Sequence, residues 1–218
     1  MIAADATLDE IRLALAPVVA DAAVFDGWSN AAVEAAAGQH GVDPAVARLA
    51  YAGGAMDMIA AWIASVDAAM AVELTAERLG NLPIRERIRS LVQFRLDAAA
   101  PQREALRRAL AIMAMPQNVR RTLKLSWSSA DAMWRLAGDV ATDYNHYTKR
   151  MILGSIYAAT LAVFAQDESE DFAETKAFLA RRIEGVMKFE KAKARFLKPR
   201  DEVFSPTRLL GRLRYPAR

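Results

Sequence analysis

Residues 25–51 read FDGWSNAAVEAAAGQHGVDPAVARLAY, and this stretch decides the fold at the amino-terminal end of the chain. Gly27 predicts the end of one helix, and a second, short helix should end at Gly41. Asp43-Pro44 predicts the start of a third helix, with aspartate as the N-cap and proline in the first turn. A helix, a glycine turn and another short helix are typical of a helix-turn-helix unit, which we place in residues 1–53.

Outward from this unit, the rest of the chain also predicts helices. Hydrophobic residues make up 54% of the 218 residues, above the usual level of roughly 45–50%, and many of them are alanine, the best helix former. No alternation of period two persists over the length of a strand. We therefore predict an all-α fold, with a larger helical bundle in residues 54–196 and a basic tail in residues 197–218.

The charge distribution argues against DNA binding by the helix-turn-helix unit. The net charge of +3 divides into −8 for residues 1–75 and +11 for the remainder. Residues 1–60 alone carry −6, which would repel a phosphate backbone. The predicted recognition helix, which begins at Asp43, offers Arg48 and no amide side chain to read a base edge. The sequence thus favours a repressor-like scaffold without a nucleic-acid role.

The most apolar part of the chain predicts a buried ligand site. The stretch 151–165 has no charge on any helical face, so we expect it to be buried on all sides. Small residues alternate there with large ones, which can leave a hollow that accepts an apolar ligand. A core filled by the protein's own side chains is the alternative, because interiors are usually close-packed. The predicted lipid-binding residues, from this stretch and the segment before Pro116, are Ile112, Met113, Met115, Met151, Ile152, Ile156, Tyr157, Leu161 and Phe164.

No catalytic constellation is evident in the sequence. The chain has no cysteine, which excludes a cysteine nucleophile, a thiolate metal site and a disulfide. Of the two histidines, His40 precedes a glycine turn, and His146 forms with Asp143 half of a metal site that has no second copy. Phosphate-binding, dinucleotide-binding and serine-hydrolase motifs are absent. We expect no enzyme activity, no cofactor and no metal.

A longer string carries a resemblance to a known family. Residues 113–118 read MAMPQN, residues 129–150 read SADAMWRLAGDVATDYNHYTKR, and Ile156-Tyr157 and Gln166-Asp167 follow. This string resembles the ninth Coq protein family, the lipid-binding accessory proteins of ubiquinone biosynthesis. The resemblance covers about residues 7–195 and is sharpest over residues 113–167. The first helices, in turn, look like the start of a TetR-type repressor.

The resemblance implies a TetR-type fold without DNA binding and a pocket for an isoprenoid quinone intermediate or a phospholipid. It also implies a partner, the di-iron demethoxyubiquinone hydroxylase or another ring hydroxylase of the pathway, to which the protein presents its lipid. A homodimer through the last two long helices is a further implication. The alternative function is a TetR-type transcriptional regulator with an apolar effector. By this resemblance the hydroxylase would dock on Asp131, Met133, Trp134, Leu136, Asp143, Tyr144, His146, Tyr147 and Arg150.

Two departures from the family bear on the partner and on the membrane. The family usually has tryptophan where this chain has His146, so docking could be weaker or a different hydroxylase could be the partner. The tail is short for a membrane-binding helix, although residues from Lys176 onward carry a net +9. Membrane contact and a solvated tail both remain open. The residues predicted to touch a membrane are Leu209, Leu210, Leu213, Arg208, Arg212 and Arg214.

The amino terminus and the hydropathy pattern suggest a location. Asp5, Asp9 and Glu10 lie where a basic region followed by an apolar run would mark a signal peptide, so we expect no secretion or organelle signal. The longest uncharged apolar run, residues 151–166, is shorter than the roughly 18–20 residues that span a bilayer. The expected location is the bacterial cytoplasm, peripheral at the inner membrane.

Overall fold

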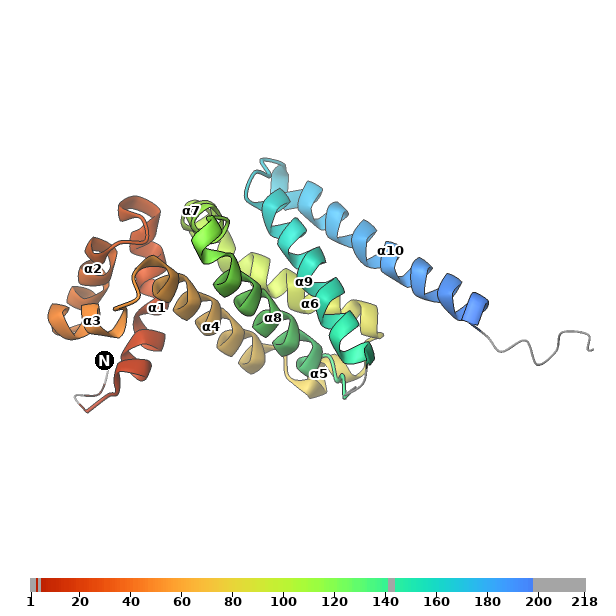
Figure 1. Cartoon of the computed structure of the whole chain (residues 1–218), viewed down its shortest axis with the longest axis horizontal. Coiled ribbons are helices and arrows are strands. Elements are labelled where there is room, and N and C mark those ends of the chain that lie inside the picture. The colour runs from red at the N-terminus through yellow and green to blue at the C-terminus, as the bar shows by residue number, and fades with distance from the viewer. Residues whose placement is uncertain (1–2, 4, 141–143, 198–218) are drawn as a thin grey trace, which may run out of the picture. The chain divides into compact units, whose positions relative to one another are not determined.

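A computed structural model describes residue 3, residues 5–140 and residues 144–197, with side chains through residue 189 (Figure 1). Every element in these residues is an α-helix or a 3-10 helix, which confirms the predicted all-α class. The described residues up to Ile183 form one compact unit, and those from Glu184 onward belong to a second. The proposed functional division at residue 53 lies inside the first unit and stays a prediction.

Local capping signals set the boundaries of the first three helices, α1 (Leu8–Asp26), α2 (Asn30–His40) and α3 (Pro44–Ala50). The Thr7 hydroxyl accepts from the Glu10 amide at 3.3 Å, and the Glu10 carboxylate accepts from the Thr7 amide at 2.8 Å, which is a capping box. Gly41 has φ of +69° and ends α2. The Asp43 carboxylate accepts from the Ala45 amide at 2.7 Å at the start of α3. The succession of helix, glycine turn and helix that the sequence predicts is therefore present in the structure.

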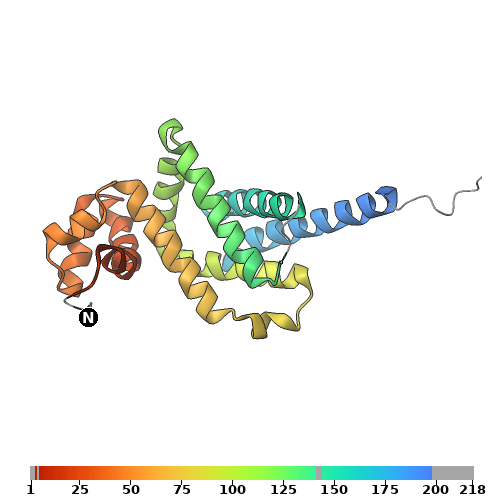
Figure 2. The same cartoon turned by 60° about the horizontal axis from the view of Figure 1, so that its bottom comes forward.

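Helix α4 (Ala55–Glu73) connects these three helices to the bundle. It packs along α1 and against α6 (Ile84–Ala99), α7 (Arg103–Met113) and α8 (Val119–Leu136) (Figure 2). The short helix α5 (Ala76–Gly80) and the 3-10 turns η1 (Ala100–Gln102) and η2 (Pro116–Asn118) join these elements. Among the described residues, α4 alone has the length and apolarity of a membrane span, and 33% of that stretch is buried inside the protein.

Helix α9 (Tyr144–Phe164) is not buried on all sides, which corrects the expectation from its lack of charge. It packs on α8 and, over fewer residues, on α6. The side chain of Met151 is 65% exposed, and Ser155, Ala159 and Ala162 are exposed on the same side of the helix. The free energy of exposing an apolar side chain to water is proportional to its surface area, so exposing a small side chain destabilises the fold only slightly. An uncharged helix built from them can therefore leave one face open.

A buried carboxylate joins α9 to the last helix, α10 (Ala173–Leu197), across the 3-10 turn η3 (Glu170–Phe172). Asp167 is buried and accepts from the amide and hydroxyl of Ser169 at 2.9 and 2.5 Å. It also accepts from the amide and hydroxyl of Thr175 at 2.8 and 2.5 Å. Burial by itself would raise the pKa of Asp167, but these four hydrogen bonds outweigh it and hold the pKa well below its usual range.

Asp167→Asn should lower the free energy of unfolding by about 1–3 kcal/mol at neutral pH, because the amide cannot accept all four hydrogen bonds. Since the folded-state pKa is depressed, this stability is present above the ordinary pKa of 3.8 and is lost as the pH falls below it. Urea unfolding at pH 7 and at pH 3 measures both effects. Asp171→Asn in the same turn, where Asp171 is exposed and pairs with Lys176, is the control. Equal losses in both variants would contradict the prediction.

Candidate functional site

Five helices of the first unit, α4, α6, α7, α8 and α9, enclose a cavity of about 210 Å³. Its walls are mostly apolar, with Ile59, Trp62 and Val66 from α4 and Leu106 and Leu110 from α7. This volume exceeds that of an engineered 150 Å³ cavity known to bind benzene. It is smaller than the roughly 300–1,000 Å³ of typical pockets for drug-sized ligands. The cavity can therefore hold one substituted ring or a short apolar segment.

The predicted lipid-binding residues fall into two groups. Met113, Tyr157 and Leu161 line the cavity. The other six do not line the cavity. Met115 and Met151 are exposed, and Phe164 is buried against Phe172 with ring centroids 4.7 Å apart. Only one side of a helix can face a given cavity, whereas the prediction chose apolar residues by composition and therefore took them from every side of the helix. The predicted residues that do not line the cavity are Ile112, Met115, Met151, Ile152, Ile156 and Phe164.

Sequence reasoning missed the contributions of α4, α6 and α8 to the cavity. Trp62 lies on an alanine-rich helix that reads simply as core. Arg95 lies on an amphipathic helix rich in charges, where an arginine is normally assigned to the solvent face. Ser126 and Ser129 lie on α8 within a polar run. No sequence signal distinguishes these residues, because their place in the wall depends on how distant helices cross.

The polar part of the cavity wall is built around Arg95, whose side chain is 3% exposed. Its Nη1 pairs with the carboxylate of Asp67, and its Nη2 donates to the Ser129 hydroxyl at 3.1 Å. The centre of its guanidinium lies 4.9 Å from the ring centroid of Tyr157, a cation–π distance. Its Nε–H has no hydrogen-bond acceptor among the described residues.

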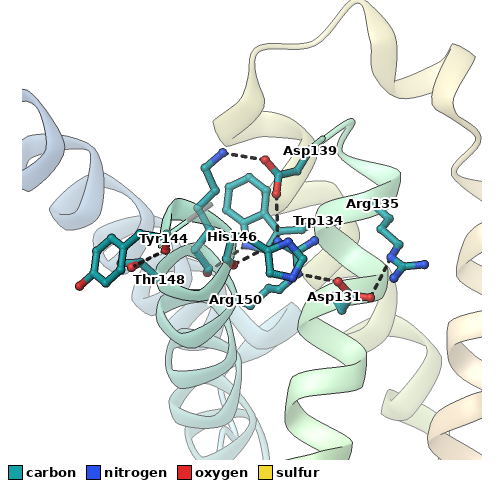
Figure 3. Close-up of polar contacts among 9 residues, drawn as sticks. Asp131, Trp134, Arg135, Asp139, Tyr144, His146, Thr148 and Arg150 are labelled. Atoms are coloured by element: carbon teal, nitrogen blue, oxygen red, sulfur yellow. Dashed lines mark hydrogen bonds and ion pairs between the residues drawn. The ribbon is translucent and has the colours of Figure 1, made fainter. Parts of the chain in front are cut away.

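A second site joins the end of α8 to the start of α9 around Arg150, whose side chain is 2% exposed (Figure 3). Its Nε donates to Asp131 at 2.5 Å, and its Nη1 donates to Asp139 at 3.0 Å. The same carboxylates also pair with Arg135 at 2.8 Å and with Lys149 at 2.6 Å. This network, with the buried Arg150 at its centre, ties the end of α8 and Asp139 to the start of α9.

Beside this network, aromatic rings gather on the surface of α8 and α9. Tyr147 is 58% exposed, and its ring centroid lies 5.2 Å from that of His146 and 5.9 Å from that of Trp127. Trp127 was not among the predicted docking residues. It precedes Asp131 by four residues and Trp134 by seven, a spacing that places all three on one helical face. The spacing of Trp127 from Asp131 and Trp134 was therefore the sequence signal that could have identified Trp127 as part of this surface.

The predicted docking residues therefore lie in different environments. Tyr144 and Tyr147 are exposed, and Tyr144 points away from the Arg150 network in Figure 3. Trp134, Leu136 and His146 are partly buried. The Trp134 indole nitrogen donates to the Lys149 carbonyl at 3.0 Å, which fixes its ring. The members with structural roles in the described chain are Met133, which is fully buried, and Asp131 and Arg150, which form the network.

The predictions for Asp143, for the absence of a metal and for the membrane-binding residues stay predictions. Asp143 lies outside the described residues. Within the described residues, no three His, Cys, Asp or Glu side chains gather in a way that could hold a metal ion. The predicted membrane-binding residues likewise lie outside the described residues: Leu209, Leu210, Leu213, Arg208, Arg212 and Arg214.

Comparison with known proteins places these features in a family. The family model of COQ9 matches residues 119–190, which contain α8, the Arg150 network and α9. The ubiquinone biosynthesis protein COQ9 of Rattus norvegicus is 35% identical over 168 residues, which cover 74% of this chain and 54% of that protein. Its human counterpart is 42% identical over 100 residues, which cover 46% of this chain and 31% of that protein. The chain belongs to the COQ9 family.

This COQ9-family chain spans between about a third and about half the length of these curated relatives. Its fold is similar to that of a TetR transcriptional regulator from Nitrosomonas europaea, with a TM-score of 0.62 and 23% identity. That likeness covers 79% of this chain and 95% of the regulator, and it confirms the TetR-type fold.

The location expected from the sequence is wrong. The COQ9 relatives from rat, human, cattle and Drosophila melanogaster are named as mitochondrial proteins. They point to a mitochondrial protein and not to the bacterial cytoplasm. The amino-terminal composition misled the prediction because the absence of a targeting pattern in a sequence says little about where the folded domain works.

Proposed function

We propose that this COQ9-family chain acts in ubiquinone biosynthesis as a lipid-binding accessory protein without catalytic activity of its own. The observation that carries the proposal is the largely apolar cavity between α4, α6, α7, α8 and α9. Two of its walls, α8 and α9, lie within the segment that matches the family. Apolar cavities favour apolar guests, and the proposed ligand is an isoprenoid quinone intermediate, with a phospholipid as the second choice.

Extraction of lipid from the natively purified protein tests this proposal. Mass spectrometry of the extract should find one lipid class in a reproducible molar ratio to the protein. The same extraction after purification from cells that make no quinone shows whether a phospholipid takes its place. A cavity that is reproducibly empty from both sources would end the proposal.

We further propose that the chain presents its lipid to a ring hydroxylase, with the demethoxyubiquinone hydroxylase as the first candidate. The support is the aromatic group formed by the exposed Tyr147 with the partly buried His146 and Trp127, beside the Arg150 network. Tyrosine and tryptophan anchors in a polar surround are the residues that carry most binding energy at interfaces.

Tyr147→Ala should weaken binding of the hydroxylase by about 1–2 kcal/mol, roughly fivefold to thirtyfold, because it removes an exposed aromatic anchor. Surface plasmon resonance with the purified hydroxylase measures the change. Phe25→Ala, which removes an exposed aromatic ring from the end of α1, is the matched control and should leave the affinity unchanged. An unchanged affinity for Tyr147→Ala would show that the partner docks elsewhere.

The proposed contact with membranes rests on charge. From Lys176 onward the sequence carries a net +9, and each basic residue near an anionic lipid surface contributes about 1 kcal/mol of attraction. Homodimerisation through α9 and α10 stays a prediction from the family resemblance. Sedimentation with vesicles of anionic and of neutral lipid tests the first idea, and the sedimentation velocity of the protein alone tests the second.

The alternative function is transcriptional regulation, in which α3 would be the helix that reads DNA. The surface of α3 gives this alternative little support. The exposed side chains of α3 include Val46 and Leu49. The guanidinium of Arg48 is already paired with the carboxylate of Glu34 at 2.5 Å. Together with the charge of −6 in residues 1–60, this surface opposes phosphate binding. A mobility-shift assay at low salt should show no complex with duplex DNA.

A further inference from the structure

The start of α8 exposes a row of apolar side chains. Met115 is 43% exposed, Val119 is 44% exposed and Leu123 is 65% exposed. Val119 and Leu123 are four residues apart and lie on one face of α8, and Met115 directly precedes the turn η2 that leads into this helix. We call these three residues the α8 stripe. Exposed apolar residues that gather in one place mark a surface that meets an apolar partner.

Two exposed cations run alongside the α8 stripe. Arg120 and Lys124 each follow a stripe residue by one position and are themselves four residues apart, so they form a second row on α8. Neither forms an ion pair with another described residue, whereas Arg121 between them pairs with Asp57. No Asp or Glu occurs in residues 105–130. Apolar side chains flanked by unpaired cations are typical of a surface that binds an anionic lipid bilayer.

The α8 stripe lies beside the opening of the ligand cavity. Among the residues that line the cavity, Ala114 and Ala158 are exposed, so the mouth lies next to them. Ala114 immediately precedes Met115, the first residue of the stripe. On α8 itself, Thr122 lines the cavity and the next residue, Leu123, is exposed. The apolar row and the way into the cavity therefore share one surface.

We propose that the α8 stripe, with Arg120 and Lys124, binds the surface of an anionic lipid bilayer and turns the mouth of the cavity toward the lipid. This inference rests on the proposed lipid-binding function and specifies the surface through which the ligand enters. It is separate from the contact proposed for the basic residues from Lys176 onward. A long apolar chain that crossed water would expose a large apolar area, and a mouth in contact with the bilayer avoids that exposure.

The composition of the stripe favours a bilayer over a protein partner. Its side chains are aliphatic, whereas protein interfaces are enriched in tyrosine and tryptophan. Those residue types begin one turn beyond Leu123, at Trp127, and continue with Tyr147 on α9. Cations with no carboxylate near them in the sequence match a surface of uniformly negative charge, as anionic lipids provide.

The absence of cysteine allows a direct test, because one thiol can be introduced at a chosen position of the full chain. The thiol introduced by Leu123→Cys is labelled with nitrobenzoxadiazole, and vesicles of phosphatidylcholine and phosphatidylglycerol are added. The emission of the label should rise and shift to shorter wavelength as the label leaves water, and brominated lipids should quench it. Leu49→Cys, at a leucine that is 59% exposed on α3, is the matched control and should show neither change.

Binding affinities test the same surface without a label. Leu123→Glu should weaken sedimentation with these vesicles by about tenfold or more, because it replaces an apolar side chain by a charge that anionic lipid repels. Leu49→Glu adds the same charge elsewhere and should change the affinity by no more than about twofold. Every variant keeps the basic residues from Lys176 onward, so a loss reports the α8 stripe alone.

The two cations have their own test. The Arg120→Gln and Lys124→Gln double variant should bind the mixed vesicles about tenfold to thirtyfold more weakly than the wild type does. Its binding to vesicles of phosphatidylcholine alone should equal that of the wild type. An equal loss on both kinds of vesicle would contradict the assignment of these cations to anionic lipid.

The outcomes separate this inference from the lipid-binding proposal. Leu123→Glu should still bind a fluorescent apolar probe in the cavity as the wild type does. A label at position 123 that stays in water, together with unchanged vesicle binding by Leu123→Glu, overturns the inference and leaves the lipid-binding proposal standing. A loss of hydroxylase binding or of self-association in Leu123→Glu, with vesicle binding unchanged, assigns the stripe to a protein partner instead. A wild-type protein that binds vesicles but no apolar probe removes the lipid-binding proposal and, with it, the role of the stripe in ligand entry.

Discussion

Arg150→Ala should lower the free energy of unfolding by about 3–5 kcal/mol, because it removes the buried positive charge between Asp131 and Asp139 and leaves them only the more exposed Arg135 and Lys149. Arg150 is 2% exposed and holds Asp131 at 2.5 Å and Asp139 at 3.0 Å. Asp139 is itself almost fully buried, so water cannot replace the lost charge. Urea unfolding followed by circular dichroism measures the change.

The same network contains its own control. Arg135 also pairs with Asp131, at 2.8 Å, but its side chain is mostly exposed to solvent. Arg135→Ala should therefore change the free energy of unfolding by no more than about 1 kcal/mol, as for other exposed ion pairs. If Arg150→Ala folds with normal stability and loses only its binding to the hydroxylase, Arg150 belongs to the docking surface, as the family resemblance implied.

Ala158→Trp should abolish ligand binding, with an affinity at least about a hundredfold lower, because the new side chain occupies the mouth of a cavity of only about 210 Å³. Ala158 both lines the cavity and is exposed, so the larger side chain can enter without displacing the buried core. Lipid extraction and displacement of a fluorescent apolar probe both measure the loss.

Ala159→Trp provides the comparison for this change. Ala159 is the next residue of α9, is also exposed and does not line the cavity. The variant should keep the lipid content of the wild type, and both variants should unfold at similar urea concentrations. Equal loss of lipid in both would indicate that the open face of α9, and not the cavity, holds the ligand.

Features of the fold that depend on neighbouring residues could be predicted from the sequence. The capping box of Thr7 and Glu10, the left-handed turn at Gly41 and the Asp43-Pro44 start of α3 involve residues at most three positions apart. Their hydrogen bonds join residues that are close in the chain, so the sequence pattern itself indicates them. The long family string likewise identified the family, because it is a property of the sequence itself.

The two sites could be predicted only in part. Met113, Tyr157 and Leu161 were found because large apolar residues before Pro116 and on α9 stood out in the sequence. Arg150 was expected on a docking surface because the family resemblance implied it. The structure buries it because carboxylates from two other positions, Asp131 and Asp139, converge on its guanidinium.

The sequence by itself determined the helical class, the starts and ends of the first helices, the absence of cysteine chemistry and the family. These depend on composition and on contacts between residues close in the chain. Only the tertiary structure decided which face of α9 meets water, which side chains surround the cavity and that Arg95 lies buried in its wall. The physical reason is that a helix has several faces of similar composition, and the crossing of distant helices selects the one that is covered.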